Sequence, residues 1–392
     1  MTSYVVDTDT GPRIHAFVVG VGSYPYGGKA AGRGTRWSGV LRGITDLTCA
    51  TLSAQHVARC LLEADWADSA VKLGTVEILV SPPAAVPWLA AYGPDTPERA
   101  SFSNVSAAGH RWFRQCGAED VALFYFCGHG WGGVQKYLLP DDFGEDPEHW
   151  DDHLINFNST HADMIDCSAA TQCFFLDTCS VDPARTTAVS AKSMVPHPYE
   201  EEEDRSSHKR IHNPVFSSSA PGLTTEVDEG KVTPLADALV RTLDGLGAVQ
   251  DGNQWLITTK QLPNAIEDVM RWYGHTDAAD TFYPTPGDLP GKRTGLRRLT
   301  QPPMVPFKLG CRPRSALGSA EWKLCCLQNG APFTRRHEPA EWCDQAPASS
   351  YRLEVTFPDN SHVPVTEPAR VIHPPTLTYD VPVRAITSRG EG

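Results

Sequence analysis

The sequence predicts an α/β protein with a mostly parallel sheet covered by helices on both faces, followed by a smaller β-rich C-terminal domain. Over residues 14–280, short apolar runs that end at glycine or proline alternate with segments of helical periodicity. Strands that alternate with helices are typical of a parallel sheet, because the helices make the crossover connections. From about residue 300 the helical periodicity fades, and an alternation of apolar and polar residues typical of half-buried strands replaces it.

The first part of the predicted sheet is built from three strands. Residues 14–24, IHAFVVGVGSY, form a buried strand that ends in glycines, and residues 47–64 follow with apolar residues at helical spacing. Residues 75–83, TVEILVSPP, are a second strand stopped by prolines. A helix near 104–117 then leads to the third strand, VALFYF, at 121–126.

The rest of the predicted sheet follows the same alternation. Residues 172–180, QCFFLDTCS, form a fourth strand and residues 213–222, NPVFSSSAPG, a fifth. The next helix begins with Thr233 as its cap and Pro234 in its first turn. Apolar residues between 266 and 273 indicate one more amphipathic helix.

Two segments differ from this pattern. Residues 181–213 contain four consecutive glutamates and few apolar residues, so we expect a mobile loop. Residues 301–392 are predicted as a β-rich domain beside a first domain of residues 1–300. Its strand candidates are EWKLCCL, YRLEVTFPD and TYDVPVRAI. The alternative is a strand-and-loop extension that packs on the first domain.

Composition narrows the class of protein. The 392-residue chain is 41% hydrophobic, as a globular protein is, and its formal net charge of −13 argues against general nucleic-acid binding. It contains no apolar run of about 18 residues, and its first residues lack the basic flank and apolar core of a signal peptide. Its 11 cysteines follow no disulfide framework, which favours reduced thiols. We therefore expect a cytoplasmic protein without a membrane span.

A histidine and a cysteine follow two of the predicted strands. His129 lies between glycines after VALFYF, and Cys179 follows the apolar run FFLD. If these strands are neighbours, both side chains emerge at the same edge of the sheet. A thiol near an imidazole makes a nucleophile, because the thiolate attacks and the histidine moves protons. The backbone N–H groups of Gly130 and Cys179 would then stabilise an oxyanion. Glycine at position 130 suits this role, because a side chain there would block the approach of a carbonyl.

These motifs resemble the caspase-fold cysteine peptidases, and most of all their metacaspase and bacterial caspase-like branch. The motifs that carry the resemblance are HAFVVGVGSYP, LRGITDLTCA, FYFCGHG, YLLPDD and FFLDTCS, within residues 14–280. His129 and Cys179 lie about 50 residues apart, as in caspases. The resemblance implies a three-layer caspase-like fold, with His129 as general base and acid and Cys179 as nucleophile.

The resemblance also implies a substrate preference. Classical caspases carry glutamine two residues before the cysteine, whereas this chain has Asp177, as metacaspases do. Asp46, in LRGITD, matches a second metacaspase aspartate, and in that branch both acids line the pocket for the residue before the cut. Two carboxylates in one pocket select a cation, which implies arginine or lysine. The alternative for Asp46 is a cap on the helix that starts near Leu47.

Three further features have weaker signals. Ser217, Ser218 and Ser219 follow a strand that borders the substrate cleft in caspase-like enzymes, so they are candidates for pairing with an extended peptide, and a plain turn is the alternative. The stretch 141–153 is rich in acidic residues, whose oxygens are the hard ligands that Ca²⁺ prefers. Its spacing does not match the loop of an EF-hand, so we favour a solvated acidic loop. The C-terminal cysteines lack the paired spacing of a zinc site, so we expect no metal there.

The sequence is therefore interpreted as a cytoplasmic cysteine endopeptidase that cleaves protein substrates after arginine or lysine and needs no cofactor. Self-processing is expected in residues 181–213, where basic residues are Arg185, Lys192, Arg205, Lys209 and Arg210. The C-terminal domain is expected to bind a regulatory or substrate protein, and the resemblance implies a bacterial defence setting. The alternatives are an inactive caspase-like scaffold that binds partners and a transpeptidase or ligase on the same fold.

Overall fold

The computed structural model describes most of the chain. The described residues are 3–6, 11–28, 43–132, 135–146, 148–149, 151–179, 190–196, 211–220, 230–287, 294–335 and 340–386. They form two compact units: the first consists of Met1–Arg241 with Thr258–Arg298, and the second of Thr242–Ile257 with Leu299–Gly392. The hairpin before residue 258 thus belongs to the second unit, whereas the predicted boundary lay near residue 300.

A seven-stranded sheet forms the centre of the first unit, in the order β1-β3-β2-β4-β8-β9-β12. Five strands run parallel: β2 (Arg13–Val21), β3 (Lys72–Ser81), β4 (Val121–Cys127), β8 (Thr171–Asp177) and β9 (Val215–Ser217). Two short antiparallel strands close the edges: β1 (Ser3–Val5) and β12 (Tyr283–Thr285). The predicted α/β class is confirmed, and the five predicted strands are these parallel ones.

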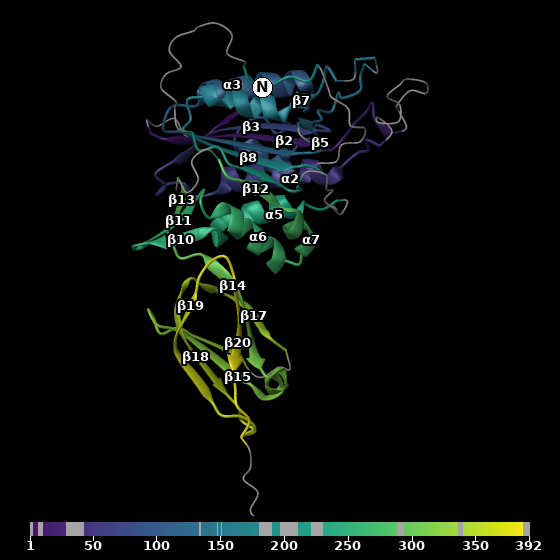
Figure 1. Ribbon diagram of the computed structural model, residues 1–392. Helices are drawn as coiled ribbons and strands as arrows, with labels where there is room; N and C mark the ends of the chain where they lie inside the picture. The colour runs from purple at the N-terminus through teal and green to yellow at the C-terminus, as the bar shows by residue number, and fades with distance from the viewer. Residues whose placement is uncertain are drawn as a thin grey trace, which may run out of the picture. The chain divides into compact units, whose positions relative to one another are not determined.

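Helices cover both faces of this sheet, because its central strands are buried along their length, except for Arg13 at the start of β2, and need packing on both sides. Figure 1 shows α3 (Phe102–Gln115) on one face and α2 (Thr48–Glu63), α5 (Pro234–Arg241) and α6 (Leu262–Trp272) on the other. The side with α3 is an aromatic core in which Phe17, Trp112 and Phe124 contact one another. The smaller helices of the unit are η2 (Pro87–Ala91), α4 (Phe157–Asp163), η3 (Met164–Asp166) and α7 (Thr276–Thr281).

The glycines of the first predicted strand have a structural reason. A Cβ at Gly20 would lie 2.6 Å from Cβ of Ala54 and 2.7 Å from the backbone oxygen of Ala50. Only glycine therefore lets α2 approach β2 this closely. This contact brings the amino end of α2 to the carboxyl edge of the sheet.

The expectation of a mobile loop over residues 181–213 is wrong for residues 190–196 and for residues 211–213, where His212 is buried and its backbone bonds to Ala170 and Gln172. Met194 and Val195 are 0% and 2% exposed, and the backbone of Lys192 bonds to Leu154 O and Asn156 N at 3.1 and 2.8 Å. Two apolar side chains and a β-bridge to Ile155 are enough to anchor this stretch among polar neighbours. Residues 180–189 and 197–210 lie outside the described residues.

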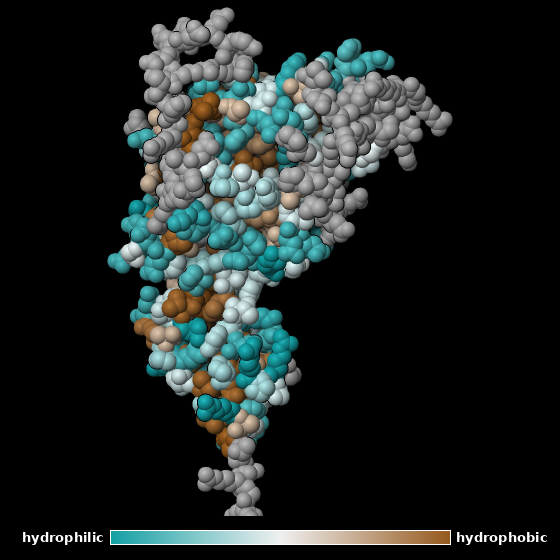
Figure 2. Space-filling view, viewed as in Figure 1, coloured by the Kyte–Doolittle hydropathy of each residue, from teal (hydrophilic) through white to brown (hydrophobic). Residues whose placement is uncertain are grey.

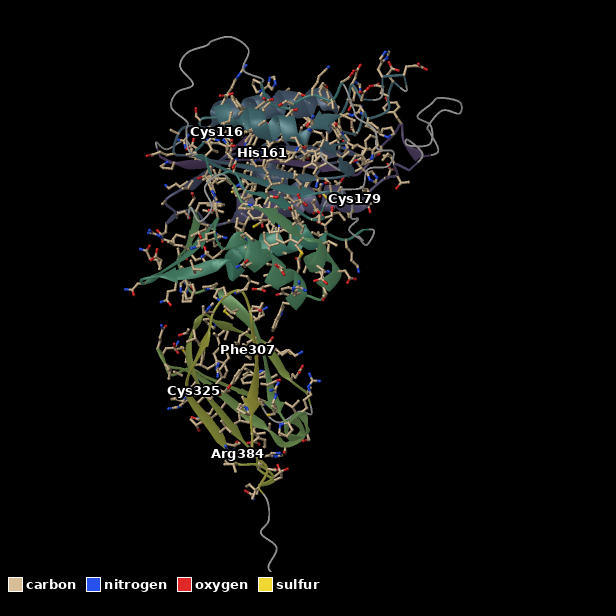
Figure 3. The ribbon with its side chains drawn as sticks, viewed as in Figure 1. Cys116, His161, Cys179, Phe307, Cys325 and Arg384 are labelled. Atoms are coloured by element: carbon tan, nitrogen blue, oxygen red, sulfur yellow. The ribbon has the colours of Figure 1, made fainter. Side chains whose placement is uncertain are left out.

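The second unit is β-rich, with two sheets around a core of its own. The first sheet has the order β17-β14-β20, with β14 (Met304–Arg312), β17 (Trp342–Pro347) and β20 (Leu377–Pro382). The second has the order β16-β15-β18-β19, with β15 (Glu321–Cys326), β16 (Pro332–Arg335), β18 (Ser349–Thr356) and β19 (Val365–Ile372). Its core includes Phe307, Trp322 and Trp342, and Figure 3 shows Phe307 inside the unit.

The remaining elements are short. They are β5 (Gly130–Gly132), β6 (Lys136–Leu138), β7 (Ile155–Asn156), β10 (Ala248–Asp251), β11 (Gln254–Thr258), β13 (Gly295–Leu299), η4 (Thr242–Leu246) and η5 (Arg314–Ser319). On the face seen in Figure 2, apolar side chains gather in small separate patches among polar ones. Within the described residues, no helix has both the length and the apolar character that crossing a bilayer requires.

Candidate active site

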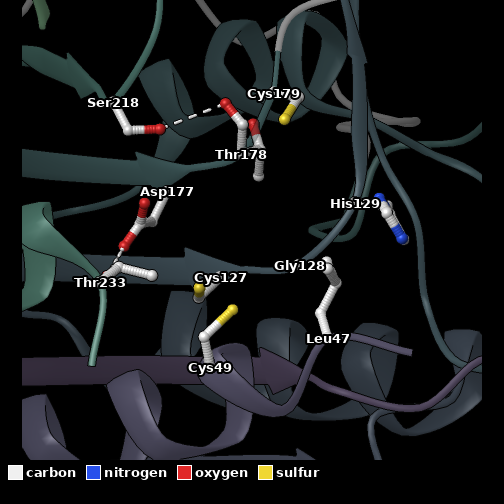
Figure 4. Close-up of a pocket in the computed structure, with 10 residues that line it drawn as sticks. All are labelled: Leu47, Cys49, Cys127, Gly128, His129, Asp177, Thr178, Cys179, Ser218 and Thr233. Atoms are coloured by element: carbon white, nitrogen blue, oxygen red, sulfur yellow. Dashed lines mark hydrogen bonds between the residues drawn. The ribbon is translucent and has the colours of Figure 1, made fainter. Parts of the chain in front are cut away.

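A pocket of about 230 Å³ opens at the carboxyl edge of β4 and β8 (Figure 4). Neighbouring strands place its chemistry, since Cys127 at the end of β4 pairs in register with Asp177 at the end of β8. His129 and Cys179 each follow two residues later, so both leave the sheet at the same level, as the sequence predicted. The lining residues are Leu47, Cys49, Cys127, Gly128, His129, Asp177, Thr178, Cys179, Ser218 and Thr233.

His129 is held by contacts on both its backbone and its ring. Its backbone N–H donates to the hydroxyl of Tyr24 at 2.7 Å, and the Tyr24 ring packs against the imidazole with centroids 4.9 Å apart. Its Nε2 lies 2.8 Å from the backbone oxygen of Thr45. A carbonyl can only accept, so Nε2 carries the proton and Nδ1 is the basic atom of the ring.

The surroundings of His129 also keep its ring neutral. Burial lowers the pKa of His129, while the Thr45 carbonyl and the charge of Asp46 oppose that shift. A neutral imidazole with a fixed tautomer is what a general base needs near neutral pH.

Cys179 differs from the other two thiols of the pocket. Cys179 is half-buried and lies at one end of the sheet (Figure 3), whereas Cys49 and Cys127 are buried. Burial raises the pKa of Cys49 to about 11 and raises that of Cys127 well above its usual value. These two cysteines therefore stay as thiols and act as apolar lining, which leaves Cys179 as the candidate nucleophile.

The N–H of Gly130 points away from the strand beside it. Three short strands form a ribbon next to the pocket: β5 (Gly130–Gly132), β6 (Lys136–Leu138) and β7 (Ile155–Asn156). Leu139 N–H donates to His129 O at 3.1 Å, so the next pair along the ladder, Gly130 with Leu138, is a non-hydrogen-bonded pair. The Gly130 N–H is therefore directed out of the ribbon, as an oxyanion donor requires.

Glycine at 130 is also required by space. A Cβ there would lie 2.8 Å from Oγ1 of Thr178 and 3.1 Å from the backbone oxygen of Cys179. The ribbon therefore packs directly against the backbone of the cysteine, and any larger residue would push the two apart.

Asp177 lies in the wall of the pocket and is almost wholly buried, with 6% of its surface exposed. Its carboxylate accepts from the hydroxyl of Tyr125 at 2.9 Å and from the hydroxyl of Thr233, as Figure 4 shows for Thr233. Burial raises the pKa of Asp177, and the hydrogen bonds from Thr233 and Tyr125 hold the shift back. Thr233 also caps α5, as predicted, by accepting from Ala236 N–H at 3.3 Å.

The expectation that Asp46 lines this pocket beside Asp177 needs correction. Asp46 is exposed, is not among the lining residues, and accepts the backbone N–H of Tyr24 at 2.7 Å. The alternative of a helix cap is also wrong, because α2 starts after Leu47 without a side-chain cap. Asp46 instead fixes the segment whose Tyr24 hydroxyl holds His129.

The interpretation of Ser217–Ser219 as a free edge also needs correction. At Ser217 β9 pairs with β8 on one side and with β12 on the other, so no peptide can add there. Ser218 and Ser219 are buried, and their hydroxyls donate to Thr178 O at 3.2 and 3.0 Å. Ser218 nevertheless lines the pocket, and it braces the residue before Cys179.

Sequence reasoning gave no role in the site to eight residues that hold or line it: Tyr24, Thr45, Leu47, Cys49, Cys127, Gly128, Thr178 and Thr233. Cys49 and Cys127 lay inside the quoted motifs, yet nothing local marks them as lining. Tyr24 and Thr45 act through long-range hydrogen bonds that no sequence period reports.

Among the described residues, one group of side chains has ligand atoms close enough for a cation. Atoms of Asp142, Glu145 and His153 lie within 4.8 Å of one another in the predicted acidic stretch. Asp141, beside them, forms an ion pair with Arg99 at 2.8 Å instead. Within the described residues, the C-terminal cysteines take part in no such group.

The comparisons with known proteins add little. No family model matches the chain. Over 84 residues it is 32% identical to the uncharacterized protein y4kE of Sinorhizobium fredii, a stretch that covers 21% of this chain and 24% of that protein. The chain thus matches about a quarter of the length of that relative.

Proposed function

We propose that this chain is a caspase-like cysteine endopeptidase that cleaves protein substrates after arginine or lysine. The observation that carries the proposal is the placement of His129 and Cys179 in one pocket, at the ends of neighbouring parallel strands, with Nδ1 of His129 as the basic atom. The motif resemblance over residues 14–280 supports the same conclusion.

The proposed mechanism uses this chain's own groups. Nδ1 of His129 takes the proton of the Cys179 thiol, and the thiolate attacks the scissile carbonyl. The N–H groups of Gly130 and Cys179 stabilise the oxyanion. When the intermediate collapses, His129 gives the proton to the leaving amine, and the acyl group stays on Sγ. Water, activated by His129, then hydrolyses the thioester and releases the enzyme.

The substrate preference is assigned to Asp177. It is a buried carboxylate in the wall of the pocket, next to the position of the scissile bond. An arginine side chain can reach its remaining oxygen lone pairs and offset the desolvation of the charge. In this proposal the second unit binds a regulatory protein or the substrate protein. The enzyme acts in a bacterial defence response and is switched on by a signal.

The proposal is tested by labelling with an activity probe. An acyloxymethyl ketone with arginine next to the warhead should label Cys179 covalently, and labelling should be lost in His129→Ala. The matched probe with aspartate in place of arginine should label much more slowly. If peptide mapping finds no adduct on Cys179 with either probe, the chain is a binding scaffold and not a peptidase.

Self-processing follows from the same preference. Four basic residues, Arg185, Arg205, Lys209 and Arg210, lie outside the described residues, whereas the backbone of Lys192 is bonded on both sides to β7 and its flanking residue. A segment must leave its pairing with other strands before a peptidase site can take it up, so we expect no nicking after Lys192 and place the expected cut after one of the other four. The measurement is intact mass after long incubation, with Cys179→Ala as the control. A single full-length chain under conditions that cleave a substrate would contradict this.

A further inference from the structure

Lys136 lies on the face of the ribbon that is turned toward Cys179. In the β5–β6 ladder Gly130 pairs with Leu138 and Gly132 with Lys136. Opposed residues, and residues two apart on one strand, share a face of an antiparallel pair, so these four residues form one face. A Cβ at Gly130 would touch Thr178 and the backbone oxygen of Cys179, which shows that this face packs against the nucleophile segment.

The ribbon holds Lys136 in this place. Its backbone N–H donates to the Oδ1 of Asn158 on α4 at 2.6 Å, and Leu138, two residues along the same face, is fully buried. Gly132, directly opposite Lys136, adds no side chain to that face. The lysine stem can therefore lie along the ribbon and present its ammonium group at the pocket edge.

The charge of Lys136 acts on the pocket. The side chain is half-buried, and this burial lowers the pKa of Lys136 to about 8, an effect that the negative charges of Cys179 and Asp177 oppose. At pH 7 the ammonium form therefore predominates. A desolvated cation beside a nucleophile attracts anions more strongly than one in water does.

We propose that Lys136 forms an anion subsite beside Cys179 that binds the carboxylate of an acidic substrate residue directly after the scissile bond. The ribbon starts at Gly130, directly after His129. Since His129 gives its proton to the leaving amine, the ribbon borders the leaving-group side of the cut. The preferred substrate is then a peptide with a basic residue before the bond and aspartate or glutamate after it. This assignment of the substrate rests on the proposed peptidase function, whereas the subsite itself can be tested on the thiol alone.

The subsite is tested by alkylation at pH 7 with two reagents that differ in charge. Iodoacetate is an anion and iodoacetamide is neutral, so the ratio of their rates at Cys179 reports the local positive charge. In Lys136→Met, which keeps the length of the side chain, the iodoacetate-to-iodoacetamide ratio should fall by about 3- to 10-fold. Lys136→Arg should restore it, and the ratio at the exposed Cys343 should not change. An unchanged ratio at Cys179 would overturn the subsite, whether or not the chain cleaves peptides.

The substrate assignment is tested with two peptides that share arginine before the bond and carry glutamate or glutamine after it. The wild type should have the higher kcat/KM on glutamate, Lys136→Met should cut both equally, and Lys136→Glu should prefer glutamine. A merely structural role of Lys136 would lower both rates together. Equal cleavage of the two peptides by the wild type would overturn the assignment of an acidic residue after the cut.

Discussion

Replacing Cys179 with alanine is expected to lower kcat/KM on an arginine peptide by at least about 10⁴-fold, and His129→Ala should have an effect of similar size. Cys179 and His129 act as one unit. Without Cys179 the base has no thiol proton to take, and without His129 the nucleophile has no base. The double variant should therefore be no worse than either single one. The measurement is cleavage of a fluorogenic peptide at equal protein concentration.

The controls separate chemistry from folding. Cys343→Ala removes an exposed thiol in the second unit and should leave kcat/KM unchanged. Cys179 is half-buried and is not among the buried core residues of the described chain, so thermal unfolding of Cys179→Ala should match that of the wild type. Activity retained by Cys179→Ala would reject the assignment, and the buried Cys49 and Cys127 would be the next thiols to test.

Replacing Asp177 with asparagine is expected to remove most of the preference for arginine. A charge pair lost across a desolvated pocket costs about 2–5 kcal/mol, so the wild type should cut a neutral residue at least roughly 30-fold more slowly than arginine. Asparagine keeps the shape that Tyr125 and Thr233 surround, whereas Asp177→Ala would also leave those two buried hydroxyls without their acceptor. The measurement is kcat/KM on matched peptides with arginine, lysine, aspartate or alanine before the reporter.

The pH dependence of this preference has a definite sign. Burial raises the pKa of Asp177, so its carboxylate takes up a proton at a higher pH than an ordinary aspartate does. The preference for arginine should therefore fall as the pH drops through that raised pKa, which is at a higher pH than for an ordinary aspartate. Asp46→Ala should reduce the preference less, because Asp46 is exposed and contacts Tyr24 rather than the pocket. Faster cleavage after aspartate than after arginine would reject an acidic pocket.

Local patterns were sufficient for the framework of the first unit. The strands around Phe17, Phe124 and Phe174 each contain a run of consecutive apolar residues, and a run of that kind has no stable place except inside a helix-covered sheet. The same patterns missed β1, β5, β6, β7 and β12, because each has only two or three residues and so few residues do not establish a period. They also misjudged residues 190–196, where only Met194 and Val195 supply the burial.

In the candidate site, too, some features follow from local sequence and others only from long-range contacts. His129 and Cys179 were recognisable in the sequence, because each follows a buried strand and parallel strands bring their ends to one edge. The sequence did not indicate the tautomer of His129, the contact of Asp46 with Tyr24 or the position of Lys136. The Tyr24 hydroxyl meets the His129 backbone across 105 residues of chain, and Lys136 faces Cys179 through the pairing of two short strands. Such contacts arise only when distant segments pack together, so no local period in the chain encodes them.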